Sequence, residues 1–161
     1  CRCRLFPEAW VWHKRRTDFR KFWRQVYNSG IARINLYKKY PESLKLVHLL
    51  PMVFTVGVTG TLLLLFFGFL PYMLGTVHAF PTLGNAMAAL GCIGLLGIIL
   101  YIIALFIDSS RKNHSVKIGV LSIRAAFTQL MGYGCGFLSA WWKRCLLGQS
   151  EFSAYNKTFY K

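Results

Sequence analysis

The sequence is poor in acidic residues and contains one long stretch without any charged residue. Only 5 of its 161 residues are Asp or Glu, and no Lys, Arg, Asp or Glu occurs between Leu46 and Ile107. No soluble domain needs such a stretch, whereas a helix that spans a bilayer needs roughly 20 consecutive apolar residues and tolerates charge poorly at its centre. The missing charge therefore argues against a single soluble domain and predicts a membrane protein.

The scarcity of acids also argues against catalysis by this part of the chain. The acidic residues lie far apart in the sequence, at Glu8, Asp18, Glu42, Asp108 and Glu151. No paired-carboxylate pattern, Asp-x-Asp metal motif, glycine-rich phosphate loop or Ser/His/Asp signature is present. The five cysteines match none of the usual zinc spacings. We therefore predict neither a catalytic residue nor a metal site in these residues.

Positive charge, by contrast, is abundant. The formal net charge is +15, and more than half of the 20 Lys and Arg residues precede Leu46. A basic segment directly before a membrane span favours anionic lipid headgroups and phosphate-bearing ligands over nucleic acid. The predicted partner is therefore a bilayer with anionic headgroups, and no nucleic acid is expected.

The region 17–41 carries the spacing of a basic amphipathic helix, with Thr17 as the expected N-cap. Its apolar positions recur at helical intervals: Phe19, Phe22, Trp23, Val26 and Tyr27. Arg20, Lys21, Arg24, Gln25 and Asn28 occupy the other side. A helix of this kind lies in a membrane interface, with its aromatic side chains toward the lipid and its cations toward the headgroups.

Arg33 does not fit this pattern. At about 100° per residue it falls close to Phe19, on the apolar side of the helix. Two interpretations remain open. Either Gly30 breaks the register of the helix, or Arg33 points away from the membrane toward an anionic group of the protein.

A transmembrane region follows at 42–145, with spans expected at about 46–70, 86–107 and 117–142 and a tail at 146–161. Pro71 is expected to end the first span and Ala86 to begin the second. Gly91, Gly94 and Gly97 leave one side of the second span nearly bare, which favours close helix packing. Residues 71–85 and 108–117 are expected to form loops.

The third apolar segment, 117–142, has two interpretations: a third span, or a re-entrant or interfacial helix. It contains Arg124 and Gln129, a Gly132-xxx-Gly136 small-residue face, and a Trp pair at its end. Arg124 either reaches the interface with its charged end or has a functional role. The distribution of Lys and Arg places the N-terminal basic region in the cytoplasm and the loop 71–85 outside.

The candidate binding site gathers cationic and polar residues near the predicted membrane surface. Its members are His13, Arg16, Arg20, Arg24, Gln25 and Arg33. Guanidinium groups bind phosphate and diphosphate oxygens in a bidentate manner, so a lipid-linked phosphate or a nucleotide diphosphate would suit this set. A solvated face that attracts anionic lipid without specificity is the competing interpretation.

A resemblance gives this set a context. Residues 7–51 carry a basic turn at His13–Arg16, an Arg24-Gln25 pair and an Asn-Ser-Gly-x-x-Arg run at 28–33, all before the spans. This stretch, together with GYGCGFLSAWWKRCLLG at 132–148, resembles the region after the catalytic domain of bacterial, Bacteroidetes-type, membrane-bound family 2 glycosyltransferases.

The resemblance implies that an α/β catalytic domain precedes this chain and that residues 1–16 are its last, extended segment. The Asp-x-Asp motif and a divalent cation, Mg²⁺ or Mn²⁺, would belong to that missing domain, so no cofactor is expected in this fragment. Processive relatives carry Gln-x-x-Arg-Trp, but Val26, Tyr27 and Asn28 follow Gln25 here. The resemblance therefore implies transfer of a single sugar rather than processive polymerisation.

The expected fold is all-α and membrane-bound, with a basic interfacial helix followed by two to three transmembrane helices. By resemblance, the chain is the membrane-anchoring and acceptor- or diphosphate-binding module of an enzyme in the bacterial inner membrane. That enzyme would move a sugar from a nucleotide-sugar to a lipid-linked or polysaccharide acceptor. The alternative is a small non-enzymatic membrane anchor or accessory protein that binds anionic lipid.

Overall fold

The computed structural model describes residues 8, 10, 18–75 and 81–149, and it contains no strand within these residues. The long helices are α1 (Phe19–Lys39), α2 (Leu50–Met73), α3 (Pro81–Asn113) and α4 (Val116–Trp141). Three short turns accompany them: η1 (Pro41–Ser43) and η2 (Leu46–His48) between α1 and α2, and the π-helical η3 (Trp142–Leu146) after α4. The extended segment predicted for residues 1–16 lies outside the described residues, apart from Glu8 and Trp10.

Helix α1 begins one residue later than predicted and continues without a break. Asp18 is the N-cap, and its carboxylate accepts a hydrogen bond from the Arg20 backbone N–H at 2.9 Å. The expectation of Thr17 as the N-cap was therefore wrong. Of the two interpretations of Arg33, a break of the register at Gly30 is also wrong, because α1 runs through this residue to Lys39.

The apolar side of α1 packs against α4. Ile31 and Ile34 of α1, together with Phe137 and Ala140 of α4, form the buried core, each at most 3% exposed. Gly30 makes the close approach possible, since a Cβ there would lie only 2.7 Å from the Phe137 backbone nitrogen. The apolar side of α1 was expected to contact lipid, but it largely contacts α4 instead.

Helices α2 and α3 form an apolar hairpin. Backbone contact at Gly68 is close enough that a Cβ would lie 2.5 Å from the Ala88 nitrogen. The expected packing role of the α3 glycines is confirmed for Gly91, which faces Leu65, and for Gly94, which faces Thr61. Gly97 has open space around its Cα and takes no part in this contact.

Segments Leu46–Met73 and Pro81–Asn113 are long and apolar enough to cross a membrane, and α4 is not among these candidates. In the most apolar 18-residue stretch of each segment, only 17% and 6%, respectively, is buried. A core helix of a soluble protein would be mostly buried, so these two helices present apolar surface that the described chain leaves uncovered.

Both helices extend further than the sequence predicted. Pro71 does not end α2, which continues to Met73. The missing N–H of the proline removes one helical hydrogen bond, close to the end of the helix. Pro81 is the first residue of α3, five positions before the expected start at Ala86. A proline is favourable there because the first helical N–H has no intrahelical partner.

The predicted loop at 108–117 was largely wrong, because α3 continues to Asn113. Asp108 and Lys112, one turn apart, form a 2.9 Å ion pair that supports the added turn. His114 then adopts a left-handed conformation with φ of 48°, which ends the helix. Ser115 caps α4 by accepting a hydrogen bond from the Ile118 backbone N–H.

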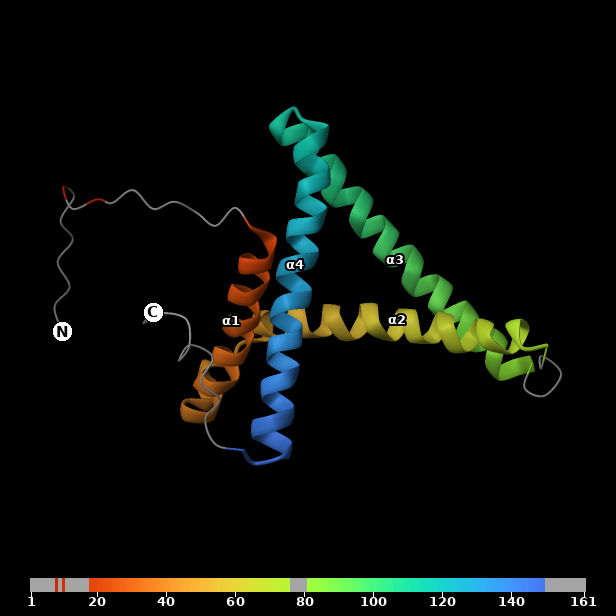
Figure 1. Ribbon diagram of the computed structural model, residues 1–161, viewed down its shortest axis with the longest axis horizontal. Helices are drawn as coiled ribbons and strands as arrows, with labels where there is room; N and C mark the ends of the chain where they lie inside the picture. The colour runs from red at the N-terminus through yellow and green to blue at the C-terminus, as the bar shows by residue number, and fades with distance from the viewer. Residues whose placement is uncertain (1–7, 9, 11–17, 76–80, 150–161) are drawn as a thin grey trace.

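Helices α2, α3 and α4 form the three sides of a triangle, and α1 lies along the outer side of α4 (Figure 1). Helices α1 and α4 run side by side, α2 leaves them crosswise, and α3 returns obliquely to the start of α4. Three aromatic rings pack where α2, α3 and α4 approach one another: Phe54 lies 5.4 Å from Phe127 and 5.6 Å from Tyr101, measured between ring centroids. The hairpin and the α1–α4 pair are thereby joined into one unit.

Candidate functional site

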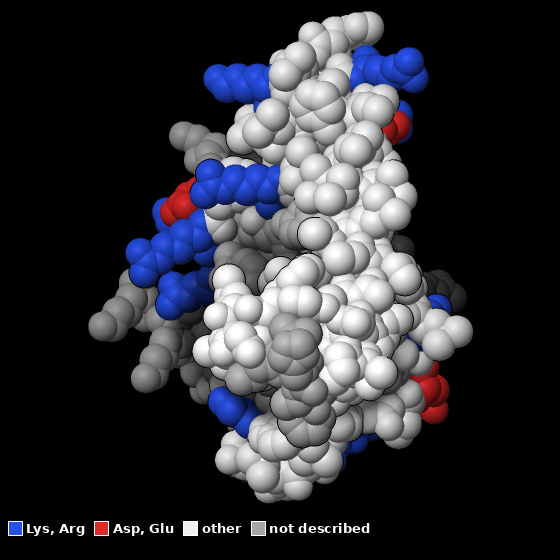
Figure 2. Space-filling model, turned by 90° about the vertical axis from the view of Figure 1, so that its right-hand side faces the viewer, with Lys and Arg blue, Asp and Glu red and all other residues white. Residues whose placement is uncertain are grey.

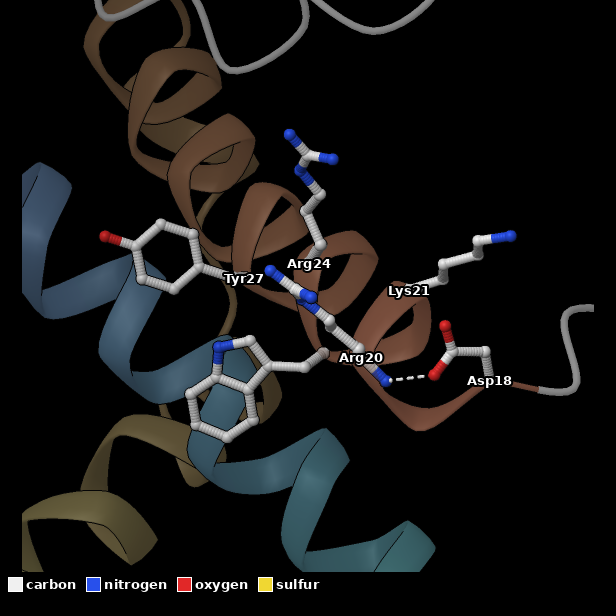
Figure 3. Close-up of a pocket in the computed structure, with 6 residues that line it drawn as sticks. Asp18, Arg20, Lys21, Arg24 and Tyr27 are labelled. Atoms are coloured by element: carbon white, nitrogen blue, oxygen red, sulfur yellow. Dashed lines mark hydrogen bonds between the residues drawn. The ribbon is translucent and has the colours of Figure 1, made fainter.

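An open pocket of about 620 Å³ lies along the N-terminal half of α1. It is lined by Asp18, Arg20, Lys21, Trp23, Arg24 and Tyr27. Three of these residues are cations and two are aromatic. Figure 3 shows the long side chains of Arg20, Lys21 and Arg24 extending away from the helix axis, with Tyr27 beyond them along α1.

Helical spacing places these side chains together. Arg20, Arg24 and Tyr27 occupy positions i, i+4 and i+7, which lie on one side of a helix. Trp23 is held by α4, since Gly132 lies directly against its indole ring. The Trp23 side chain nevertheless remains 39% exposed and forms part of the pocket wall.

The pocket is positively charged with little internal compensation. Of the described residues that line it, only Asp18 is acidic, and its carboxylate accepts a hydrogen bond from the Arg20 backbone N–H. Among the described residues, no carboxylate lies within ion-pair distance of Arg20, Lys21 or Arg24. The first turn of α1 adds the positive end of its helix dipole. The pocket is therefore suited to an anion.

The structure brings together only part of the predicted site. Arg20 and Arg24 line the pocket. Gln25 is not among the lining residues, because it is rotated about 100° from Arg24 around the helix. Arg33 lies on the opposite side of α1 from Arg24, since nine residues separate the two along the helix. His13 and Arg16 lie outside the described residues.

Sequence reasoning missed four lining residues: Asp18, Lys21, Trp23 and Tyr27. The two aromatic residues were assigned to the apolar side that packs or meets lipid. Their spacing from Arg20, three and seven residues further along, was the signal that could have placed them beside the cations. An aromatic wall next to cations can accommodate a phosphate group joined to an apolar or planar part.

Two further cations, one on α4 and one on η3, contact α1. The Arg124 guanidinium lies over the Phe19 ring at 4.3 Å from its centroid, a cation–π contact between the two helices. At the other end, Arg144 Nη1 donates a 2.7 Å hydrogen bond to Asn35 Oδ1. Both Arg residues therefore have interhelical contacts in the structure. The described part of the chain contains no cluster of three or more His, Cys, Asp or Glu side chains suited to a metal ion.

Comparison with known proteins adds no relative to these observations. No protein-family model, curated protein or solved structure matches the chain. What the chain binds must therefore be inferred from the pocket on α1 and from the helices that hold it.

Proposed function

We propose that this chain is the membrane-anchoring, diphosphate-binding module of a family 2 glycosyltransferase. The observation that carries the proposal is the pocket on α1, where Arg20, Lys21 and Arg24 lack ion-pair partners among the described residues and lie beside Trp23 and Tyr27. It lies on the helix that directly precedes two helices able to cross a membrane. The resemblance of residues 7–51 to this enzyme family supports the same assignment.

In this proposal α2 and α3 cross the bacterial inner membrane, and α1 lies on its cytoplasmic side. Lys and Arg residues accumulate on the cytoplasmic side of membrane proteins. The described part of α1 carries six of them: Arg20, Lys21, Arg24, Arg33, Lys38 and Lys39. The connection between α2 and α3 carries neither Lys nor Arg.

The chemical role of the pocket would be to hold a diphosphate. In the family that the sequence resembles, a preceding catalytic domain moves a sugar from a nucleotide-sugar to a lipid-linked or glycan acceptor with inversion. A divalent cation would belong to that domain. Arg20 and Arg24 would donate hydrogen bonds to phosphate oxygens, and Lys21 would add a third positive charge. The exposed side of Trp23 would contact the attached apolar or planar group.

Binding of a soluble nucleoside diphosphate tests this role directly. The chain would be reconstituted in nanodiscs of zwitterionic lipid, and binding of UDP, GDP and inorganic pyrophosphate would be measured by calorimetry. Each charge-assisted hydrogen bond contributes about 1.5–3 kcal/mol, so Arg20→Gln and Arg24→Gln are each expected to weaken binding by roughly tenfold or more. The single variants Lys38→Gln and Lys39→Gln are the matched controls, because each removes one cation of α1 that lies outside the pocket.

The alternative function, a non-enzymatic anchor for anionic lipid, predicts a different result. Equal losses in the pocket variants and in the Lys38 and Lys39 controls would indicate nonspecific charge attraction, which salt would weaken uniformly. Reading the gene upstream of the Cys1 codon is an independent check. An in-frame nucleotide-binding domain with an Asp-x-Asp motif is expected, and an upstream frame without one would contradict the glycosyltransferase assignment.

A further inference from the structure

Helix α4 was predicted either as a third span or as a re-entrant or interfacial helix, and its packing bears on this choice. Figure 1 shows α2 running crosswise to α4, whereas α1 and α4 lie side by side. Transmembrane helices are tilted by at most about 40° from the bilayer normal. Two helices that cross in this way cannot both span the bilayer within that range, so a membrane-spanning α2 requires α4 to lie near the membrane plane.

The side chains of α4 agree with this orientation. Apolar residues recur at helical spacing along one side of α4, which we call the apolar seam: Val116, Val120, Ile123, Phe127, Leu130, Leu138 and Trp141. The seam faces the hairpin, since Phe127 packs on Phe54 and Tyr101 and the Leu130 carbonyl lies near the Thr55 hydroxyl. An interfacial helix turns such an apolar side toward the hydrocarbon, which is the side on which the two candidate spans lie here.

The opposite side of α4 is occupied by α1. Gly132 and Gly136 of α4 contact Val26 and Tyr27 of α1 so closely that a Cβ at Gly132 would lie 2.5 Å from the Val26 methyl carbon. Helix α4 is therefore placed between the hairpin and α1. Packed helices lie about 8–10 Å apart, so α1 and its pocket are raised above the level of α4 on the side away from the hairpin.

The distribution of charge gives independent support. A spanning α4 would place Lys143 and Arg144 outside, apart from the other described cations and against the positive-inside rule. With α4 flat, every described Lys and Arg lies on the α1–α4 side of the triangle, away from the α2–α3 turn. Figure 2, viewed from the side of the α2–α3 turn, shows an uncharged central surface with Lys and Arg at the edges.

We infer that α4 lies flat at the cytoplasmic surface of the membrane, with its apolar seam toward the hydrocarbon and α1 on its aqueous side. The occupant of the exposed part of the seam is the bilayer itself. Residues before α1 and residues after α4 then lie on the same side of the membrane. The pocket lies at the level of the headgroups or above, where a phosphate is reached from the aqueous phase.

Cysteine accessibility tests this topology. In a cysteine-free background, single variants Gln129→Cys, Val120→Cys and Leu63→Cys would be reconstituted in nanodiscs and reacted with a charged maleimide. Gln129 lies at the middle of α4, away from the seam, and Val120 lies on the seam. Because a charged reagent is excluded from hydrocarbon, Gln129→Cys is expected to react at least about tenfold faster than Val120→Cys.

Two other outcomes of the labelling at positions 129 and 120 would contradict the inference. In a spanning α4, position 129 lies at the bilayer centre and position 120 near its edge, so Val120→Cys would react faster. Equal, fast reaction at both positions would mean that α4 is detached from the bilayer. Because the topology presupposes that α2 crosses the membrane, Leu63→Cys at the middle of α2 is the control. Fast labelling there would instead contradict membrane insertion, and it would leave the diphosphate assignment to the binding experiment.

Discussion

Single glycines decide how closely the helices approach. A Cβ at Gly30 or Gly136 would collide with backbone atoms of the opposite helix, so these positions accept no larger residue without movement of α1 relative to α4. Gly57 and Gly60 of α2 have no atom of another element within 4 Å of an added Cβ. The same residue type therefore has a packing role in the α1–α4 contact and none at these two positions of α2.

This contrast predicts opposite signs for the same substitution. Gly30→Ala is expected to lower the free energy of unfolding by about 1–3 kcal/mol, because the added methyl overpacks the helix contact. Gly57→Ala is expected to raise it by about 0.5–1 kcal/mol through reduced backbone entropy in the unfolded chain. Unfolding in mixed micelles, followed by circular dichroism, measures both values. A stabilised Gly30→Ala variant would show that α1 and α4 are less tightly packed than described.

At the scale of the element, α1 depends on its first turn. Asp18 caps the helix and also lines the pocket, so its two roles can be separated by substitution. Asp18→Ala removes the cap and is expected to destabilise the helix start by about 0.5–2 kcal/mol. Asp18→Asn keeps a good cap and removes only the charge.

Hydrogen exchange of the first two turns of α1 measures this difference. Faster exchange is expected at residues 20–24 in Asp18→Ala and unchanged exchange in Asp18→Asn. The Asn variant is also expected to bind a diphosphate more tightly, because the one acidic side chain among the described lining residues is neutralised. Equal exchange in both variants would mean that the carboxylate does not act as a cap.

The junction of α2, α3 and α4 offers an element-scale test of packing. Phe54 and Phe127 meet edge to face, with an interplanar angle of 74°. A double-mutant cycle with Phe54→Leu and Phe127→Leu is expected to give a coupling energy of about 0.5–1.5 kcal/mol. Phe66 and Phe67 form an edge-to-face pair within α2, with ring centroids 5.2 Å apart, so the same cycle there measures the coupling of such a pair without a contact between helices. No coupling between Phe54 and Phe127 would mean that α4 is not held against the hairpin.

Much of this element structure could be predicted from the sequence, because long apolar runs and helical spacing are strong local signals. The absence of charge after Leu46 indicated the hairpin, and the Gly132-xxx-Gly136 spacing indicated a contact side of α4. The connection after Asp108 could not be placed, since polar residues suit both a loop and an added turn held by an ion pair. The orientation of α4 depends on contacts between helices that composition does not encode.

The candidate site was predictable to a similar degree. The cations at 20 and 24 were identified because guanidinium groups before a span stand out by composition. Trp23 and Tyr27 were assigned to the apolar side, since spacing alone does not reveal that a ring packed on a glycine keeps its outer face exposed. Arg33 was grouped with Arg24 as a guanidinium near the predicted membrane surface and through the resemblance, although the helix turns it to the opposite side.

At the scale of the whole molecule, the charges predict a protease pattern. In vesicles that expose the cytoplasmic side, trypsin is expected to cut on both sides of the hairpin and leave a protected fragment from Leu46 to Arg111. No Lys or Arg occurs within that fragment before its last residue. In vesicles of the opposite orientation the chain is expected to stay intact. Mass spectrometry identifies the fragments, and cleavage at Lys143 or Arg144 in the second preparation would contradict the flat orientation of α4.

The uncharged tip of the α2–α3 hairpin has a consequence for biogenesis. A charged residue costs about 2.5–3.5 kcal/mol at the centre of an inserting helix, and the connection that would cross the membrane in the proposed topology carries no Lys, Arg, Asp or Glu. For a chain inserted as proposed, α2 and α3 can enter the bilayer together as a preformed pair. The basic residues on either side then remain where they were synthesised, so the hairpin needs no translocated domain to reach its final orientation.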